Sequence, residues 1–321
     1  MNYKPIIIVA GEPNSIFFEI FFKAIGNNKY KKPIILIASK NLLIKQMKKL
    51  NFNFEINLIN KKNITFGRIN NKKINLIDVH LQFKKIFDKI SDKSNSYINE
   101  CFEIALEILK KNKCSGLING PISKKNFLKE QYLGITEYLA EKTNRRNKVA
   151  MLIFNKKLSV SPITTHLPLK EVHKNLTIKK IIYNTRLIKN FYIKHFKKNP
   201  KIGITGLNPH CESNYKSSEE DKVIKPAIKM LIKSKFRIKG PIAADTIFMK
   251  EQSKNYDVVV GMYHDQVLTP IKTLFGFNAI NITLGLPFIR ISPDHGPNIS
   301  MLGKNISTPK SLIEALKFLD K

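Results

Sequence analysis

Three of the seven histidines in this chain stand just after segments that are typical of buried strands. His166 follows Pro-Ile-Thr-Thr, His210 follows Lys-Ile-Gly-Ile-Thr-Gly through Leu-Asn-Pro, and His264 follows Asp-Val-Val-Val-Gly-Met-Tyr. Parallel α/β sheets bind ligands at the carboxyl ends of their strands, so these imidazoles are expected to converge. Three neutral imidazoles that leave a fourth position open are typical of a catalytic metal site. The alternative for each single histidine is an ordinary surface or core position, because the three come from distant segments.

Two aspartates of this basic chain, Asp245 and Asp265, fall at predicted strand-to-helix junctions. Carboxylates at such positions can orient histidine ligands or serve as a general base, and we predict catalytic roles for both. Helix capping is an equally good explanation of Asp245.

Polar side chains also interrupt the apolar stretch between Asp257 and Gly296, at Lys272, Asn281 and Arg290. Together with Thr136, Lys272 and Arg290 are suited to holding a phosphate or carboxylate, since arginine offers a bidentate fork. Lysine is abundant throughout the sequence, so Lys272 has a simple compositional alternative, whereas Arg290 stands alone in an apolar phrase.

The elements that must position these residues alternate between strand and helix. Continuous apolar runs predict strands buried on both faces, and amphipathic spacing predicts helices between them. Predicted strands are 5–10, 33–38, 74–77, 115–119, 149–154, 158–164, 201–206 and 257–261, and predicted helices are 41–50, 96–111, 178–196, 218–233 and one from 309. Ser15, Ser96 and Thr136 are the expected helix caps. This alternation predicts an α/β fold with a mostly parallel sheet flanked by helices.

Composition restricts the class of protein further. The 321 residues are 43% hydrophobic with a net charge of +32, which alone suggests a nucleic-acid or anionic partner. Lysine, asparagine and isoleucine are enriched everywhere, and the basic runs lack interleaved aromatics, so we expect no nucleic-acid partner. No stretch approaches 18 uninterrupted apolar residues, so we expect no membrane span. Three cysteines without a Cys-x-x-Cys spacing fit a reducing cytoplasm. No usual dinucleotide, P-loop or nucleophile-elbow motif is present.

Longer phrases resemble the 4-hydroxythreonine-4-phosphate dehydrogenases of pyridoxal phosphate biosynthesis along essentially the whole chain. The phrases that carry the resemblance are Gly11-Glu12-Pro13, Asn119-Gly120-Pro121-Ile122-Ser123-Lys124, Thr164-Thr165-His166-Leu167-Pro168, Gly206-Leu207-Asn208-Pro209-His210, Gly240-Pro241 with Ala244-Asp245-Thr246, Met262-Tyr263-His264-Asp265-Gln266, 281–290 and Asp294-His295-Gly296.

The resemblance implies that His166, His210 and His264 bind one divalent metal (zinc, cobalt or magnesium). It assigns Thr136, Lys272, Asn281 and Arg290 to a small anionic phosphorylated substrate. It also implies a homodimer with the active site at the interface and metal ligands from both subunits. NAD or NADP is the implied oxidant, and 295–303 resembles the adenine-binding loop of isocitrate and isopropylmalate dehydrogenases.

An isocitrate/isopropylmalate dehydrogenase-like fold of two subdomains with a cleft is implied as well. We place the subdomains at approximately 1–130 plus 265–321 and approximately 131–264. The implied activity is oxidation of the 3-hydroxyl of 4-phosphooxy-L-threonine, followed by decarboxylation of the 3-oxo acid.

Two positions depart from the family pattern. Ile135 stands where the family usually has histidine, and Phe17-Phe18 replaces a Gly-Pro. The isoleucine side chain cannot form a hydrogen bond, so either the rate is lower, another side chain substitutes, or the substrate is a close analogue. A phosphorylated sugar acid such as threonate or erythronate 4-phosphate is the alternative substrate, because related enzymes use the same metal site. A basic nucleic-acid-binding protein is the alternative from another class.

Overall fold

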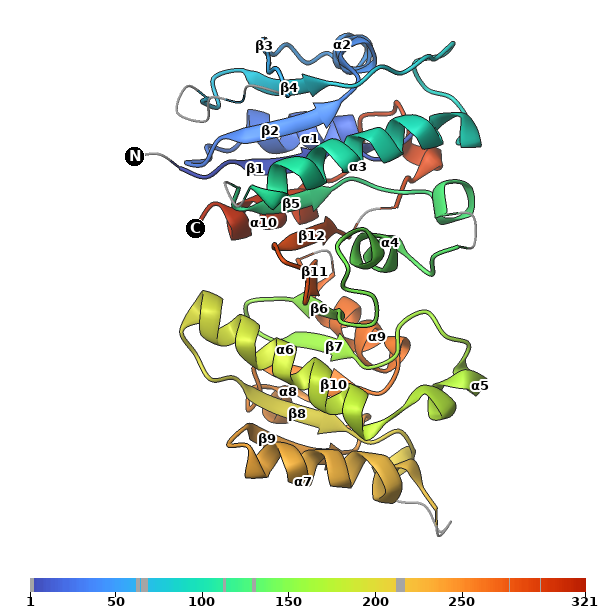
Figure 1. The fold of residues 1–321 in the computed structure, drawn as a ribbon, viewed down its shortest axis with the longest axis vertical. Helices are drawn as coiled ribbons and strands as arrows, with labels where there is room; N and C mark the ends of the chain where they lie inside the picture. Colours follow the sequence, from blue (N-terminus) through green and yellow to red (C-terminus); the bar gives the residue numbers. More distant parts are fainter. Residues whose placement is uncertain are drawn as a thin grey trace. The chain divides into compact units, whose positions relative to one another are not determined.

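The computed structural model describes residues 3–61, 64, 69–111, 114–128, 131–211, 217–276, 278–294 and 296–321 (Figure 1). Contacts divide the chain into a first unit of Met1–Lys142 and Pro287–Lys321 and a second unit of Thr143–Leu286. The chain therefore crosses between units near 142 and 286, whereas the sequence analysis placed the crossings near 130 and 264.

The first unit is built on a parallel sheet with the strand order β3-β4-β2-β1-β5-β12. Its strands are β1 (Ile6–Val9), β2 (Ile34–Ala38), β3 (Ile56–Leu58), β4 (Ile74–Asp78), β5 (Gly116–Asn119) and β12 (Arg290–Pro293). All four residues of β1 are fully buried, as expected for a central parallel strand covered on both faces.

The helices of the first unit are α1 (Phe17–Gly26), α2 (Lys40–Lys49), α3 (Asn95–Lys110), α4 (Ile135–Lys142) and α10 (Lys310–Leu319). Figure 1 shows α3 in front of this sheet and α1 behind it. Two predicted caps are wrong, because Ser96 lies inside α3 and Thr136 lies within the first turn of α4. Ser15 stands one residue before the N-cap position Ile16, and its Oγ accepts from Phe17 N–H at the start of α1 at 3.3 Å. The same hydroxyl donates to the Glu12 carbonyl at 2.6 Å and closes the turn after β1.

The second unit has the strand order β11-β6-β7-β10-β8-β9. Strands β7 (Ser159–Pro162), β10 (Val258–Gly261), β8 (Lys201–Thr205) and β9 (Arg237–Ile242) are parallel, and β6 (Ala150–Phe154) runs antiparallel to β7 and to β11 (Ile280–Leu284). The strands predicted at 149–154 and 158–164 pair as an antiparallel hairpin, and the predicted α/β class with a mostly parallel sheet is confirmed.

The helices of the second unit are α5 (Leu169–Val172), α6 (Ile178–Phe196), α7 (Lys225–Lys233), α8 (Lys250–Ser253) and α9 (His264–Phe275). The single helix predicted over 218–233 is divided into a π-helical turn at Glu220–Ile224 and α7. Pro226 lies at the start of α7, where its missing N–H is tolerated. None of the described helices is long and apolar enough to cross a membrane.

Candidate active site

The three strands that precede the predicted metal ligands are neighbours in the second unit. The order β7-β10-β8 is parallel throughout, so their carboxyl ends lie at one edge of the sheet. The rings of His166 and His264 lie beyond this edge with their centroids 5.9 Å apart. The pairing of these two rings is therefore a consequence of strand order.

His264 is the first residue of α9, and its Nδ1 lies 2.6 Å from Asp265 Oδ1. A carboxylate only accepts hydrogen bonds, so in a neutral imidazole the proton is held on Nδ1 and the Nε2 lone pair is available to a metal. Asp265 itself is 78% exposed. The geometry therefore suits Asp265 to orienting the histidine ring.

His210 has a different setting. It lies in the short helical turn Pro209–Cys211, and its φ of +56° falls in the left-handed region that residues other than glycine rarely adopt. Among the described residues, no group of three or more His, Cys, Asp or Glu side chains is close enough to hold a metal ion. The three-histidine set, with ligands from two subunits, therefore stays a prediction.

Arg290 is the first residue of β12, and its side chain is 0% exposed. Its Nε donates to Asn119 Oδ1 at 2.7 Å, and its Nη1 donates to Thr136 Oγ1 at 3.2 Å. Burial lowers the pKa of Arg290 to about 10, opposed by the nearby Glu137 carboxylate, so the guanidinium stays cationic at neutral pH. Two predicted substrate residues, Thr136 and Arg290, are thus brought together in the first unit.

Asn119 is a member of this group that the sequence analysis did not select. It ends β5, next to β12 in the sheet, and is 2% exposed. Its amide also donates to the Gly120 carbonyl at 2.9 Å, which fixes the orientation of Oδ1 toward Arg290. The signal available in the sequence was its place at the head of the Asn-Gly-Pro phrase, at the end of a predicted strand.

The other predicted substrate residues, Lys272 and Asn281, belong to the second unit. Lys272 is exposed on α9, about two helical turns after His264. Asn281 lies in β11, and its Oδ1 is buried without a hydrogen-bond partner in the described part of the chain. Asp245 is exposed in the turn after β9. The joint membership of these residues with Thr136 and Arg290 in one site stays a prediction.

The predicted cofactor loop is described only in part, since His295 lies outside the described residues. Gly296 is exposed, and the following Pro297 carbonyl accepts a hydrogen bond from Ile16 N–H at 3.2 Å. The loop is thereby attached to the turn that leads from β1 into α1.

A pocket of about 620 Å³ lies in the first unit beside that turn. It is lined by side chains from the β1 turn, from the segment after β4 and from the start of α3, among them His80, Lys84, Lys85, Asp88, Lys89 and Lys93. Asn14 connects two of these segments, because its amide donates to the Lys89 carbonyl and its Oδ1 accepts from Asp88 N–H. Four lysines against a single aspartate make the pocket suited to an anion.

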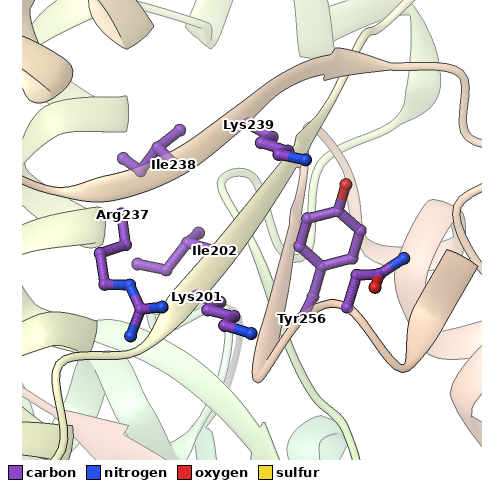
Figure 2. A pocket seen from close by; sticks show the side chains of 7 residues that line it. Lys201, Ile202, Arg237, Ile238, Lys239 and Tyr256 are labelled. Atoms are coloured by element: carbon purple, nitrogen blue, oxygen red, sulfur yellow. The ribbon is translucent and has the colours of Figure 1, made fainter.

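A second pocket, of about 280 Å³, lies at the amino ends of β8 and β9 (Figure 2). Lys201 is the first residue of β8 and Arg237 the first of β9, and the Tyr256 ring lies beside Lys239. His210 follows the opposite end of β8. The residues that line this pocket include none of the predicted site residues.

Comparisons with known proteins agree with the resemblance in the sequence. The family model described as "Pyridoxal phosphate biosynthetic protein PdxA" matches residues 29–319. A 4-hydroxythreonine-4-phosphate dehydrogenase of Sulfurihydrogenibium sp. (strain YO3AOP1) is 39% identical over 317 residues, covering 97% of this chain and 96% of the relative. A protein of Oceanobacillus iheyensis named "Putative D-threonate 4-phosphate dehydrogenase" is 32% identical over 98% of this chain and 97% of its own length.

Solved structures give the same result. The crystal structure of 4-hydroxythreonine-4-phosphate dehydrogenase from Klebsiella pneumoniae is 26% identical, with a TM-score of 0.85 and coverage of 98% of both chains. A β-decarboxylating dehydrogenase from Thermococcus kodakarensis, 10% identical with a TM-score of 0.50, shares the fold. The chain belongs to the PdxA family of pyridoxal phosphate biosynthetic proteins.

Proposed function

We propose that the chain is a metal- and NAD(P)-dependent 4-hydroxythreonine-4-phosphate dehydrogenase. It would oxidise the 3-hydroxyl of 4-phosphooxy-L-threonine to the 3-oxo acid, which loses carbon dioxide to give 3-amino-2-oxopropyl phosphate. The observation that carries this proposal is the buried Arg290 joined to Thr136 and Asn119, in a chain 39% identical to a relative of that name.

A buried guanidinium is suited to a doubly charged substrate for an electrostatic reason. Arg290 has its Nε held by Asn119 and its Nη1 by Thr136, so the plane of the guanidinium is fixed before a ligand arrives. A preorganised fork binds phosphate or carboxylate with little loss of side-chain entropy. Lys272 would add a second positive charge, and the Thr136 hydroxyl could contact the same anion.

The histidines fit a divalent metal. The ring centroids of His166 and His264 are 5.9 Å apart, so one nitrogen of each ring can reach a shared ion at the usual metal–nitrogen distance of about 2.1 Å. His210, from this subunit or its partner, would complete the set. A bound metal would supply Lewis acidity at the substrate hydroxyl, and a nicotinamide would supply the hydride acceptor.

The two aspartates would then divide their roles. Asp265 is bonded to His264, which supports a role in orienting that ring. Asp245 is exposed at the carboxyl end of β9, which leaves its carboxylate accessible to receive the hydroxyl proton.

We assign NAD or NADP to the first unit. His295 and Gly296 would contact the adenine end, and the lysines of the 620 Å³ pocket would neutralise the phosphates. The attachment of the loop to the β1 turn through Ile16 and Pro297 supports this assignment. We further propose a cytoplasmic homodimer with the active site at its interface.

A phosphorylated sugar acid is the second candidate substrate. The Oceanobacillus relative, 32% identical, carries the D-threonate 4-phosphate name, and Ile135 removes a polar group beside Thr136. Such acids carry a neutral hydroxyl at C2 in place of the substrate ammonium group, so the site would need no partner for a positive charge there.

The test is NADH or NADPH formation from 4-phosphooxy-L-threonine, D-threonate 4-phosphate and erythronate 4-phosphate, each with and without added Zn²⁺, Co²⁺ or Mg²⁺. Metal-dependent reduction with the first substrate at the highest kcat/KM supports the proposal. A higher kcat/KM on a sugar acid supports the second candidate. Absence of reduction on all three, together with salt-dependent DNA binding, would replace both with the nucleic-acid alternative.

A further inference from the structure

A continuous chain of hydrogen bonds connects the three strand ends that carry the histidines. Thr164, two residues before His166, donates to the Met262 carbonyl through its N–H at 3.1 Å and through Oγ1 at 2.7 Å. Met262 lies two residues before His264, and its own N–H donates to Gln266 Oε1 at 2.7 Å. The ends of β7 and β10 are therefore joined at the two residues that lead into the paired histidines.

Gln266 extends this chain to the end of β8. Its Oε1 also accepts from Thr205 Oγ1 at 2.8 Å, and its Nε2 donates to the Gly206 carbonyl at 2.8 Å. The side chain is 8% exposed, so these bonds form away from water. A Cβ on Gly261 would lie 2.4 Å from Val267 Cγ1 and 3.0 Å from Gln266 Oε1, so the glycine gives the start of α9 room to pack against β10.

Glu220 holds the segment between Gly206 and His210. The carboxylate is 1% exposed, and Oε1 accepts from the N–H groups of Leu207 at 2.7 Å and Asn208 at 2.9 Å. Its Oε2 accepts from Asn208 Nδ2 at 2.7 Å. Burial alone would raise the pKa of Glu220, but hydrogen bonds from Asn208 and Leu207 outweigh it and keep the pKa below its ordinary value.

The segment needs such support because of its backbone. His210 and Cys211 both have positive φ, at +56° and +57°. Non-glycine residues are strained in this region and persist only where the surroundings fix them. Glu220 fixes the two residues before Pro209, and Gln266 fixes Gly206.

We propose that Gln266 and Glu220 are positioning residues that hold the segments of His264 and His210 in the geometry required for metal binding. In the described part of the chain, the hydrogen bonds of both side chains go to the segments that precede the histidines and mainly to their backbone groups, so both would act through backbone. The proposal rests on the proposed function in that it assumes that the histidines bind a metal.

The competing explanation is that both residues stabilise the fold and nothing more. A matched control separates the two explanations. Gln46 is also a buried glutamine, 1% exposed, and it donates to the carbonyls of Pro13 at 3.3 Å and Ile86 at 3.0 Å. It belongs to the first unit and is bonded to none of the histidine segments, so Gln46→Met should destabilise the protein without changing the metal site.

The experiment measures Co²⁺ binding by calorimetric titration of the full-length apoprotein, alongside Tm without metal, for wild type, Gln266→Met, Glu220→Ala, Glu220→Gln and Gln46→Met. We expect Gln266→Met and Glu220→Ala to raise the Co²⁺ Kd by about 10- to 100-fold, the range for supporting groups around metal ligands. Gln46→Met should lower Tm as Gln266→Met does but leave Kd unchanged. Glu220→Gln keeps an oxygen for the two backbone N–H groups, so it should recover most of the affinity lost in Glu220→Ala.

The outcomes also separate this inference from the proposed function. Equal Kd values for wild type, Gln266→Met and Glu220→Ala would overturn the positioning role, as would an equal rise in Gln46→Met. If wild type binds no Co²⁺, or binds it equally well after His264→Ala, the metal assignment itself fails.

Discussion

Asn119 and Arg290 are bonded to each other on neighbouring strands. Asn119 Oδ1 accepts from Arg290 Nε at 2.7 Å, and both side chains are shielded from solvent. β5 and β12 are adjacent parallel strands in which Arg290 is in register with Leu117, and the Arg290 side chain reaches two residues further along β5 to Asn119, 171 residues away in sequence. This pair sets the orientation of the positive charge proposed to hold the substrate.

Replacing the arginine tests the value of its fork. In Arg290→Lys the positive charge remains, but one ammonium cannot reproduce the planar contacts with Asn119 and Thr136. We expect kcat/KM for the phosphorylated substrate to fall by roughly 10- to 100-fold, since hydrogen bonds to charged groups contribute about 1.5–3 kcal/mol. Steady-state kinetics measure this, and an unchanged kcat/KM would remove Arg290 from the substrate site.

The hydrogen-bonding role of the Thr136 hydroxyl can be tested separately from the shape of the side chain. Thr136→Val keeps the side-chain volume but removes the acceptor for Arg290 Nη1, whereas Thr136→Ser retains it. Val should raise KM by about 5- to 50-fold because a buried donor loses its partner, and Ser should stay close to wild type. If the two variants behave alike, the hydroxyl has no role in binding.

The histidines are expected to control metal-dependent turnover. His166→Ala and His264→Ala should each abolish it, while circular dichroism and Tm stay near the wild-type values. His173→Ala is the control, since His173 is exposed on the surface of the second unit. Turnover that survives in both site variants in metal-free buffer would refute the metal assignment.

Ile135 gives a gain-of-function prediction. It begins α4 next to Thr136 and offers the substrate no hydrogen bond. Ile135→His, which restores the residue usual in the family, should raise kcat/KM on 4-phosphooxy-L-threonine by about 2- to 10-fold, the effect of one net hydrogen bond. A gain on D-threonate 4-phosphate alone would point to the second candidate substrate.

Glu12 gives a prediction about pH and stability. Burial raises the pKa of Glu12, although hydrogen bonds from Asn14 and Ser94 oppose this. The folded protein therefore binds this proton more tightly than the unfolded chain does, and the associated stability is present below the unfolded pKa and lost as pH rises through the folded pKa.

Glu12→Gln removes the buried charge and should raise Tm at pH 7 by roughly 1–4 °C. The difference from wild type should shrink as the pH falls toward the unfolded pKa of about 4.3. Thermal melts across this pH range measure the effect. A variant that is less stable than wild type at pH 7 would show that the carboxylate is needed in its charged form.

The sequence predicted most of the frame, and in two of its candidate sets the structure brings members together, His166 with His264 and Thr136 with Arg290. Apolar runs placed β1, β2, β5 and β10 within one residue or two of their observed bounds, because central parallel strands need continuous burial. Capping was predicted less well. The Ser15 hydroxyl bonds both to the start of α1, through Phe17 N–H, and to the turn at Glu12, and only the folded turn brings these two partners together.

Their places after strands indicated His166, His210 and His264 as a candidate metal set, and residue type indicated Thr136, Lys272 and Arg290 as candidates for binding an anion. Only the tertiary structure decided which side chains hold them. Asn119, Gln266 and Glu220 are polar residues with no distinctive spacing, and their roles depend on strand order, which brings β5 beside β12 and β10 beside β8. Hydrogen bonds between such distant segments leave no local pattern, because they are set by which strands pair and not by the residues that flank each one.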